Sequence, residues 1–177
     1  IMVPGSQATV LVTGQSGGGK SYLAGLLVER WIEAGYSVLI IDPEGDHGGL
    51  RELADVVHVD ASIRLPNPAE LVAAFSRGRA STILDLTALE PPARALYLHE
   101  LQPLLEAERL THGVPHWIVV DEAHLQTAEA PDLMPLLPIG PGLCLVTYRP
   151  DLLPGASLSE EDRTFMRNLE SPPNEDL

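Results

Sequence analysis

A glycine-rich segment near the start of the chain constrains the fold more than any other feature. In order, it consists of Gly14, Gln15, Ser16, Gly17, Gly18, Gly19, Lys20 and Ser21, which fits the pattern G-x-x-x-x-G-K-S. Apolar and β-branched residues at 8–13 precede it and predict a buried strand, and residues 22–31 follow it with apolar positions at helical spacing. A strand, this loop and a helix in succession predict a phosphate-binding loop.

The residue types of this loop suit a nucleotide. Glycines let the backbone curl so that successive N–H groups point at phosphate oxygens, and the helix N-terminus adds its positive end. Lys20 is expected to reach the β and γ phosphates, Ser21 to ligate Mg²⁺, and Tyr22 to lie at the base of the cradle. The alternative is a glycine-rich turn that binds nothing. Lys20 is the one lysine among eleven basic residues, and the other ten are arginines. A compact ammonium therefore occurs only in this loop, which favours the nucleotide site.

Strand and helix patterns alternate along the rest of the chain. Strands are expected at residues 37–42, 56–59, 81–86, 117–120 and 143–150, and helices at about 50–54, 69–77 and 91–111. The alternation predicts an α/β fold, with a largely parallel sheet covered by helices on both faces. The core contacts expected from the helix at 91–111 are Leu96, Leu101, Leu104, Leu105 and Leu110.

Length and composition exclude several classes of protein. The 177 residues suit one domain, expected at 1–158, followed by an acidic, flexible tail at 159–177. The net charge of −14 argues against a broad DNA-binding face on this fragment.

Cys144 is the one cysteine, so no intramolecular disulfide or multi-cysteine metal site is expected. With no signal peptide and no apolar run near the roughly 18–20 residues of a membrane span, we expect a cytoplasmic protein without membrane contact. Because it opens on Ile1, we expect a piece of a longer chain.

A second motif follows about 100 residues after the glycine-rich loop. The apolar residues 117–120 end in Asp121 and Glu122, which is typical of a Walker B strand. Asp121 would hold Mg²⁺ through water, together with Ser21, and Glu122 would orient the water that attacks the γ phosphate. A strand ending in a solvated acidic turn is the alternative, but the preceding phosphate loop makes the pair more specific. His124 could contact this site or pack locally.

Two other strand ends supply candidate residues. The loop Asp42–His47 carries three acids and a histidine, and ligands of open α/β sheets bind beyond such strand ends. It is either a solvated turn or a contributor near the γ phosphate, with Asp42 and Glu44 the better candidates. On the last strand, Thr147 is expected near the position of a γ-phosphate sensor. Arg149 is a charge stabiliser acting in cis or in trans, or a salt-bridged surface residue.

Taken together, these segments resemble the ATPase core of the HerA/FtsK superfamily of P-loop ATPases. The resemblance rests on the loop at 14–21, the strand end at 41–46, the Asp121–His124 stretch and the strand end at 147–150, and it spans about residues 8–150. It implies a RecA-like three-layer sandwich, ATP hydrolysis with Mg²⁺, and often hexameric rings that move DNA or protein. Tyr148 departs from the pattern, because members of the group often carry glutamine there.

The resemblance leaves several functions open. The chain is short and acidic, and it lacks the substrate-binding domains of the translocases. We therefore expect the ATPase piece of a larger protein, or a nucleotide-dependent switch, acting as a homo-oligomer, with a hexamer as one form, or with a partner protein. Residues 35–42 and 48–51 are also similar to the second-strand region of adenylylsulfate-type kinases, but those enzymes need no later Asp-Glu pair, and no arginine-rich lid is evident. A nucleotide-binding module without hydrolysis is the third candidate, and Glu122 beside Asp121 argues against it.

Overall fold

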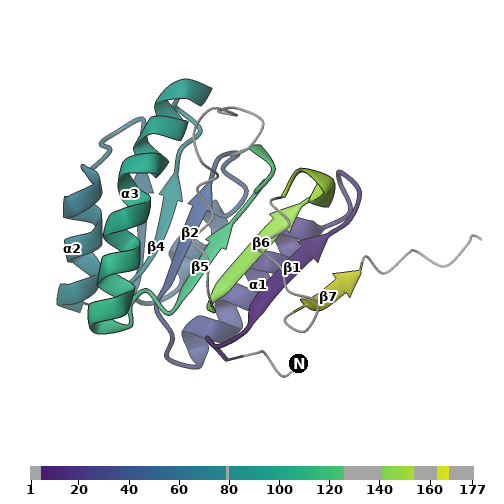
Figure 1. Ribbon diagram of the computed structural model, residues 1–177, viewed down its shortest axis with the longest axis horizontal. Coiled ribbons are helices and arrows are strands. Elements are labelled where there is room, and N and C mark those ends of the chain that lie inside the picture. The colour runs from purple at the N-terminus through teal and green to yellow at the C-terminus, as the bar shows by residue number, and fades with distance from the viewer. Residues whose placement is uncertain (1–4, 79, 126–140, 154–162, 168–177) are drawn as a thin grey trace, which may run out of the picture.

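The computed structural model describes residues 5–78, 80–125, 141–153 and 163–167, which form a three-layer α/β domain (Figure 1). The strands are β1 (Thr9–Thr13), β2 (Val38–Asp42), β3 (Val56–Asp60), β4 (Ser81–Asp85), β5 (Trp117–Val120), β6 (Leu143–Thr147) and β7 (Arg163–Arg167). The α-helices are α1 (Lys20–Glu33), α2 (Pro68–Gly78) and α3 (Pro91–His112). Short 3₁₀ helices span Gly48–Glu52 and Pro150–Leu152.

The sheet has the order β3-β4-β2-β5-β6-β1-β7, and every neighbouring pair of strands is parallel. The glycine-rich loop follows β1, and the Asp-Glu pair follows β5. The strand β6 lies between β1 and β5 in the sheet. Because all these strands run the same way, the loops that follow β1, β2, β5 and β6 gather at one edge of the sheet. The predicted α/β fold of the RecA-like type is confirmed.

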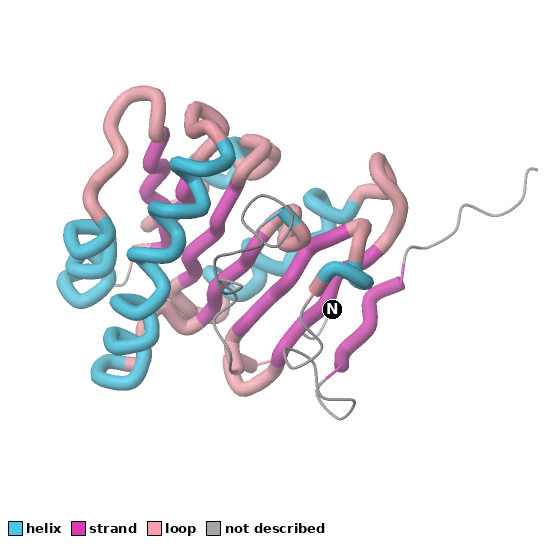
Figure 2. The backbone as a smooth tube through the Cα atoms, turned by 45° about the horizontal axis from the view of Figure 1, so that its top comes forward, coloured by secondary structure: helices cyan, strands magenta, loops and turns pink. Residues whose placement is uncertain are grey.

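Helices cover both faces of the sheet: in Figure 1 α3 lies in front of it and α1 behind it, and Figure 2 shows the helices on either side of the strands. On the α1 face, Trp31 stacks on Trp117 of β5 with ring centroids 3.9 Å apart. On the other face, Phe75 of α2 and Leu101 of α3 pack against the strands. The central strands are apolar on both sides because neither face meets water.

The predicted core contacts of α3 were wrong at three of five positions. Leu101 and Leu105 are buried, but Leu96, Leu104 and Leu110 are 54%, 37% and 89% exposed. The helix carries leucines on more than one face, so their spacing alone could not identify the face that meets the sheet. Among the described residues, no helix combines the length and apolar character that crossing a bilayer requires.

Part of the segment expected to be a flexible tail forms a strand. Residues Arg163–Arg167 are β7, which pairs with β1 in the register Thr9↔Arg163 to Thr13↔Arg167. The rest of that segment, 159–162 and 168–177, lies outside the described residues. The domain boundary at residue 158 stays a prediction.

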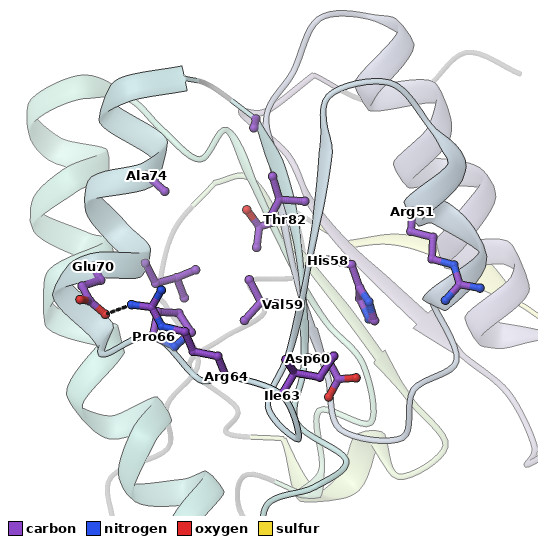
Figure 3. Close-up of a pocket in the computed structure, with 13 residues that line it drawn as sticks. Arg51, His58, Val59, Asp60, Ile63, Arg64, Pro66, Glu70, Ala74 and Thr82 are labelled. Atoms are coloured by element: carbon purple, nitrogen blue, oxygen red, sulfur yellow. Dashed lines mark ion pairs between the residues drawn. The ribbon is translucent and has the colours of Figure 1, made fainter.

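A cavity of about 560 Å³ lies along the open edge of the sheet at β3 (Figure 3). Val59 and Ala74 line it on the α2 side, where Arg64 lies 3.5 Å from Glu70, and Arg51 lies across the strand. Four strands separate β3 from β1. This cavity is therefore separate from the place where the glycine-rich loop and the Asp-Glu pair meet.

Candidate active site

The glycine-rich loop between β1 and α1 has a backbone shape suited to an anion. Gly17 and Gly19 have φ values of 74° and 76°, and no other atom lies within 4 Å of the place where a Cβ would stand. Backbone conformation rather than crowding therefore favours glycine at both positions. The helix α1 begins directly after Gly19 without a side-chain cap. The first N–H groups of α1 consequently have no acceptor within the helix, and the helix dipole adds positive potential there.

Lys20 is folded back over this loop. Its side chain is buried, and Nζ donates a hydrogen bond of 3.2 Å to the carbonyl oxygen of Gln15. The ammonium also lies 5.7 Å from the centre of the Tyr148 ring, which is a cation–π distance. Within the part of the chain that the structure describes, Lys20 makes no ion pair. Its charge is thus available to an anion in the loop.

Asp121, directly after β5, is buried and held on both carboxylate oxygens. Oδ2 lies 2.7 Å from Nε2 of His47, and Oδ1 accepts the N–H of Glu122 at 2.8 Å. The Ser21 hydroxyl also bonds to this carboxylate. Burial alone would raise the pKa of Asp121, but the hydrogen bond and charge of His47, with the Glu122 and Ser21 bonds, hold it below its usual value. The structure therefore brings Ser21 and Asp121 together across two segments distant in sequence.

This pair fits Mg²⁺ among the common metals. Ser21 and Asp121 offer a hydroxyl and a carboxylate, both hard oxygen donors. Among the described residues, no three His, Cys, Asp or Glu side chains converge to form a metal cage. Mg²⁺ usually takes one or two protein ligands and completes its shell with water and substrate phosphates. The donor set beside an anion-binding loop is of that kind.

Glu122 has an unusual backbone conformation and a buried side-chain oxygen without a hydrogen-bond partner among the described residues. Its φ is 44°, in the left-handed region that residues with a Cβ seldom adopt. Its side chain is 12% exposed, and no described group donates a hydrogen bond to the buried oxygen Oε2. Nδ1 of His124 is 3.1 Å from this oxygen, which is within ion-pairing distance, but the pair lacks hydrogen-bond geometry. Burial, and then the charge of Asp121, raise the pKa of Glu122, and Lys20 opposes this shift. Oε2 is free to accept a hydrogen bond from a small ligand such as water.

Thr147 and His124 join the end of β6 to the turn after β5. Nδ1 of His124 lies 3.1 Å from Oγ1 of Thr147, and both side chains are buried. The same Thr147 oxygen accepts the N–H of Arg149 at 2.9 Å. His124 therefore lies between the predicted sensor residue and Glu122. The sequence left the placement of this histidine open.

The loop after β2 is closed by Asp42. This carboxylate is fully buried and accepts the N–H groups of Gly45, Asp46 and His47 at 2.7, 3.2 and 2.9 Å. The interpretation as a solvated turn is therefore wrong for Asp42, whereas Glu44 is exposed. The expected contribution of Asp42 and Glu44 near the γ phosphate stays a prediction.

Two other candidates, Arg149 and Tyr22, lie at the surface, as does Tyr148. Arg149 is exposed, and its Nε and Nη2 bind the carboxylate of Asp151 at 3.0 and 2.9 Å. This arrangement matches the surface salt bridge considered for it, and its charge-stabilising role stays a prediction. Tyr22 is largely exposed at the start of α1. Tyr148 is partly exposed, and its ring meets that of His124 edge-on at 4.4 Å.

His47 is the residue that sequence reasoning missed. The sequence places His47 in the loop after β2, but it favours the acids of that loop as site residues. The sequence feature that could have identified it is its position in a loop that follows a strand of a parallel sheet, because ligands bind at such loops. Its contact with Asp121 depends on β2 and β5 being neighbours in the sheet, as they are here.

The order of strands and this site together define a P-loop ATPase domain with one strand inserted between the P-loop strand and the Asp-Glu strand. A family model described as the central domain of helicase HerA matches residues 7–127, more than half of the chain. The chain belongs to this family. No curated protein matches the sequence.

Proposed function

We propose that this domain binds ATP with Mg²⁺ on the loop Gly14–Ser21 and hydrolyses the γ phosphate. The observation that carries the proposal is the convergence of three features at one edge of the sheet. These are the uncapped N-terminus of α1, the contact between Ser21 and Asp121, and the unsatisfied oxygen of Glu122. An anion cradle, a metal-binding pair and a buried acceptor for water are the parts that phosphoryl transfer to water requires.

Each residue has a distinct task in this proposal. The N–H groups at the start of α1 bind the phosphates, and Lys20 leaves its contact with Gln15 to reach the β and γ phosphates. Ser21 and Asp121 hold Mg²⁺, which when bound neutralises charge on the phosphates. Glu122 accepts a hydrogen bond from the attacking water and orients it in line with the γ phosphate. Thr147 senses the γ phosphate from the end of β6.

We further propose that the domain works within a larger or oligomeric translocase or as a nucleotide-dependent switch. Family membership supports a motor-like role, and a homo-oligomer, with a hexamer as one form, or a complex with a partner protein is the expected state. Arg149 is exposed, so it can reach a nucleotide in cis or in a neighbouring subunit. The net charge of −14 favours a partner other than DNA for this fragment alone.

Release of inorganic phosphate from ATP and Mg²⁺, without any acceptor, tests the proposal. An ATPase releases phosphate steadily, a small-molecule kinase releases it slowly, and a binding module releases none. Lys20→Ala is the control, because Nζ bonds only one carbonyl oxygen within the described residues and its loss should leave the fold intact. By calorimetry, this variant should bind nucleotide at least about tenfold more weakly. An unchanged affinity would place the nucleotide elsewhere.

A further inference from the structure

Each acid of the Asp121-Glu122 pair has its own buried histidine. His47 lies 2.7 Å from Oδ2 of Asp121, and His124 lies 3.1 Å from Oε2 of Glu122. The two contacts differ in kind, because only the first is a hydrogen bond. An ionised carboxylate can only accept, so Nε2 of His47 carries the donated hydrogen. His47 is therefore a fixed donor to the acid that is proposed to hold Mg²⁺.

We propose that His47 is a positioning residue for Asp121: it fixes the carboxylate in the orientation that binds Mg²⁺ with Ser21. This inference rests on the proposed function. With Oδ2 held by His47 and Oδ1 held by the N–H of Glu122, the carboxylate cannot rotate about its side-chain bonds without losing a hydrogen bond. Its orientation toward the Ser21 hydroxyl is thereby set before a metal arrives. Outer-shell partners of this kind typically change metal affinity by about 10–100-fold.

The loop after β2 is built to deliver this imidazole. The backbone N–H of His47 donates to Oδ2 of Asp42 at 2.9 Å, and its ring is almost fully buried. The Asp42 carboxylate also accepts the N–H groups of Gly45 and Asp46, so the bonds that close the loop involve no side chain other than that of Asp42. A change of the His47 side chain therefore keeps every one of these loop contacts. This separates the imidazole's effect on Asp121 from the shape of the loop.

A merely structural histidine would stabilise the fold without affecting the metal in particular. The test therefore measures by calorimetry how tightly the protein binds ADP in the presence of Mg²⁺ and in the presence of EDTA. The ratio of the two affinities is the gain that Mg²⁺ produces. His47→Ala should lose about 10–100-fold of that gain and keep its affinity in EDTA. His47→Gln, whose amide nitrogen can take the place of Nε2, should recover most of it. His47→Asn, which is too short to reach Asp121, should not.

His124→Ala is the matched control, because it removes an equally buried histidine from the other acid. It should leave the Mg²⁺-dependent gain unchanged. Binding of Mn²⁺ to the ADP complex, followed by electron paramagnetic resonance, gives a second readout that does not depend on turnover. If the wild-type protein binds no ADP, the proposed function fails. If it binds ADP and His47→Ala retains the full Mg²⁺ effect, the positioning role is refuted.

Should His47→Ala fail to fold, the two amide variants decide the question. Equal Mg²⁺ dependence in His47→Gln and His47→Asn would overturn the inference, because only glutamine restores a donor at the right reach. A difference in favour of glutamine would support it.

Discussion

We expect Glu122→Gln to cut ATP turnover by about 10²-fold or more while nucleotide affinity stays within a few-fold of the wild-type value. Glutamine keeps the size of the side chain and one carbonyl acceptor, but it removes the negative charge that polarises the attacking water. Lys20, Ser21 and Asp121 are unchanged, so the groups that bind phosphate and metal remain. The loss should therefore fall on the rate of reaction.

The structure also indicates that this substitution is mild for the fold. No described group donates a hydrogen bond to Oε2, so no donor loses its acceptor when an amide takes its place. Burial already disfavours the charged form, as the raised pKa of Glu122 indicates, so a neutral amide is at least as easy to bury. Glutamine also tolerates a φ of 44° no worse than glutamate does. We expect the free energy of unfolding to change by less than about 1 kcal/mol, against about 2.7 kcal/mol for a 10²-fold loss in turnover.

Steady-state phosphate release and a binding isotherm on the same preparation separate the two effects. Glu44→Gln is the control, since Glu44 is the exposed one of the two acids considered near the γ phosphate in the loop after β2. It should hydrolyse ATP at close to the wild-type rate. Wild-type turnover in Glu122→Gln would make that carboxylate structural and refute the reasoning, and a large loss in Glu44→Gln would transfer the role to the loop after β2.

Three further outcomes are expected. Residues 1–177 should bind duplex DNA weakly or not at all at about 150 mM salt, because phosphate contacts need a basic face, and sub-micromolar binding in a gel-shift assay would contradict this. Gly142→Ala should lower the free energy of unfolding by more than about 2 kcal/mol, since Gly142 has a φ of 76° and a Cβ would meet the carbonyl oxygen of His116. Gly25→Ala, with open space around it, is the control, and urea denaturation measures both. Cys144 should stay unmodified by an aromatic disulfide reagent until the protein unfolds, because burial in β6 raises the pKa of its thiol.

The parts of the fold and site that could be predicted are those set by short stretches of sequence. The loop at 14–21 and the Asp121-Glu122 pair each follow an apolar strand, and local pattern alone places them at strand ends. Their common edge follows from the parallel sheet that the strand–helix alternation predicts. In the structure Ser21 and Asp121 are indeed in contact.

What could not be predicted depends on the neighbours that the fold provides. His47 and Asp121 are 74 positions apart, and only the pairing of β2 with β5 brings their loops together. The strand β7 contains two apolar residues among five, and it gains its order from pairing with β1. Leu110 lies on a helix with leucines on several faces, so packing rather than spacing decided its exposure.

The strand inserted between β1 and β5 explains how the two halves of the site are linked. Because β6 separates them, its end lies between the glycine-rich loop and the acidic pair. Tyr148 contacts both sides there, since its ring is 5.7 Å from the ammonium of Lys20 and 4.4 Å from the ring of His124. Movement of Lys20 toward a bound phosphate would weaken the first contact and leave the second. Tyr148 therefore lies between the ammonium of Lys20 and His124, the histidine nearest to Glu122.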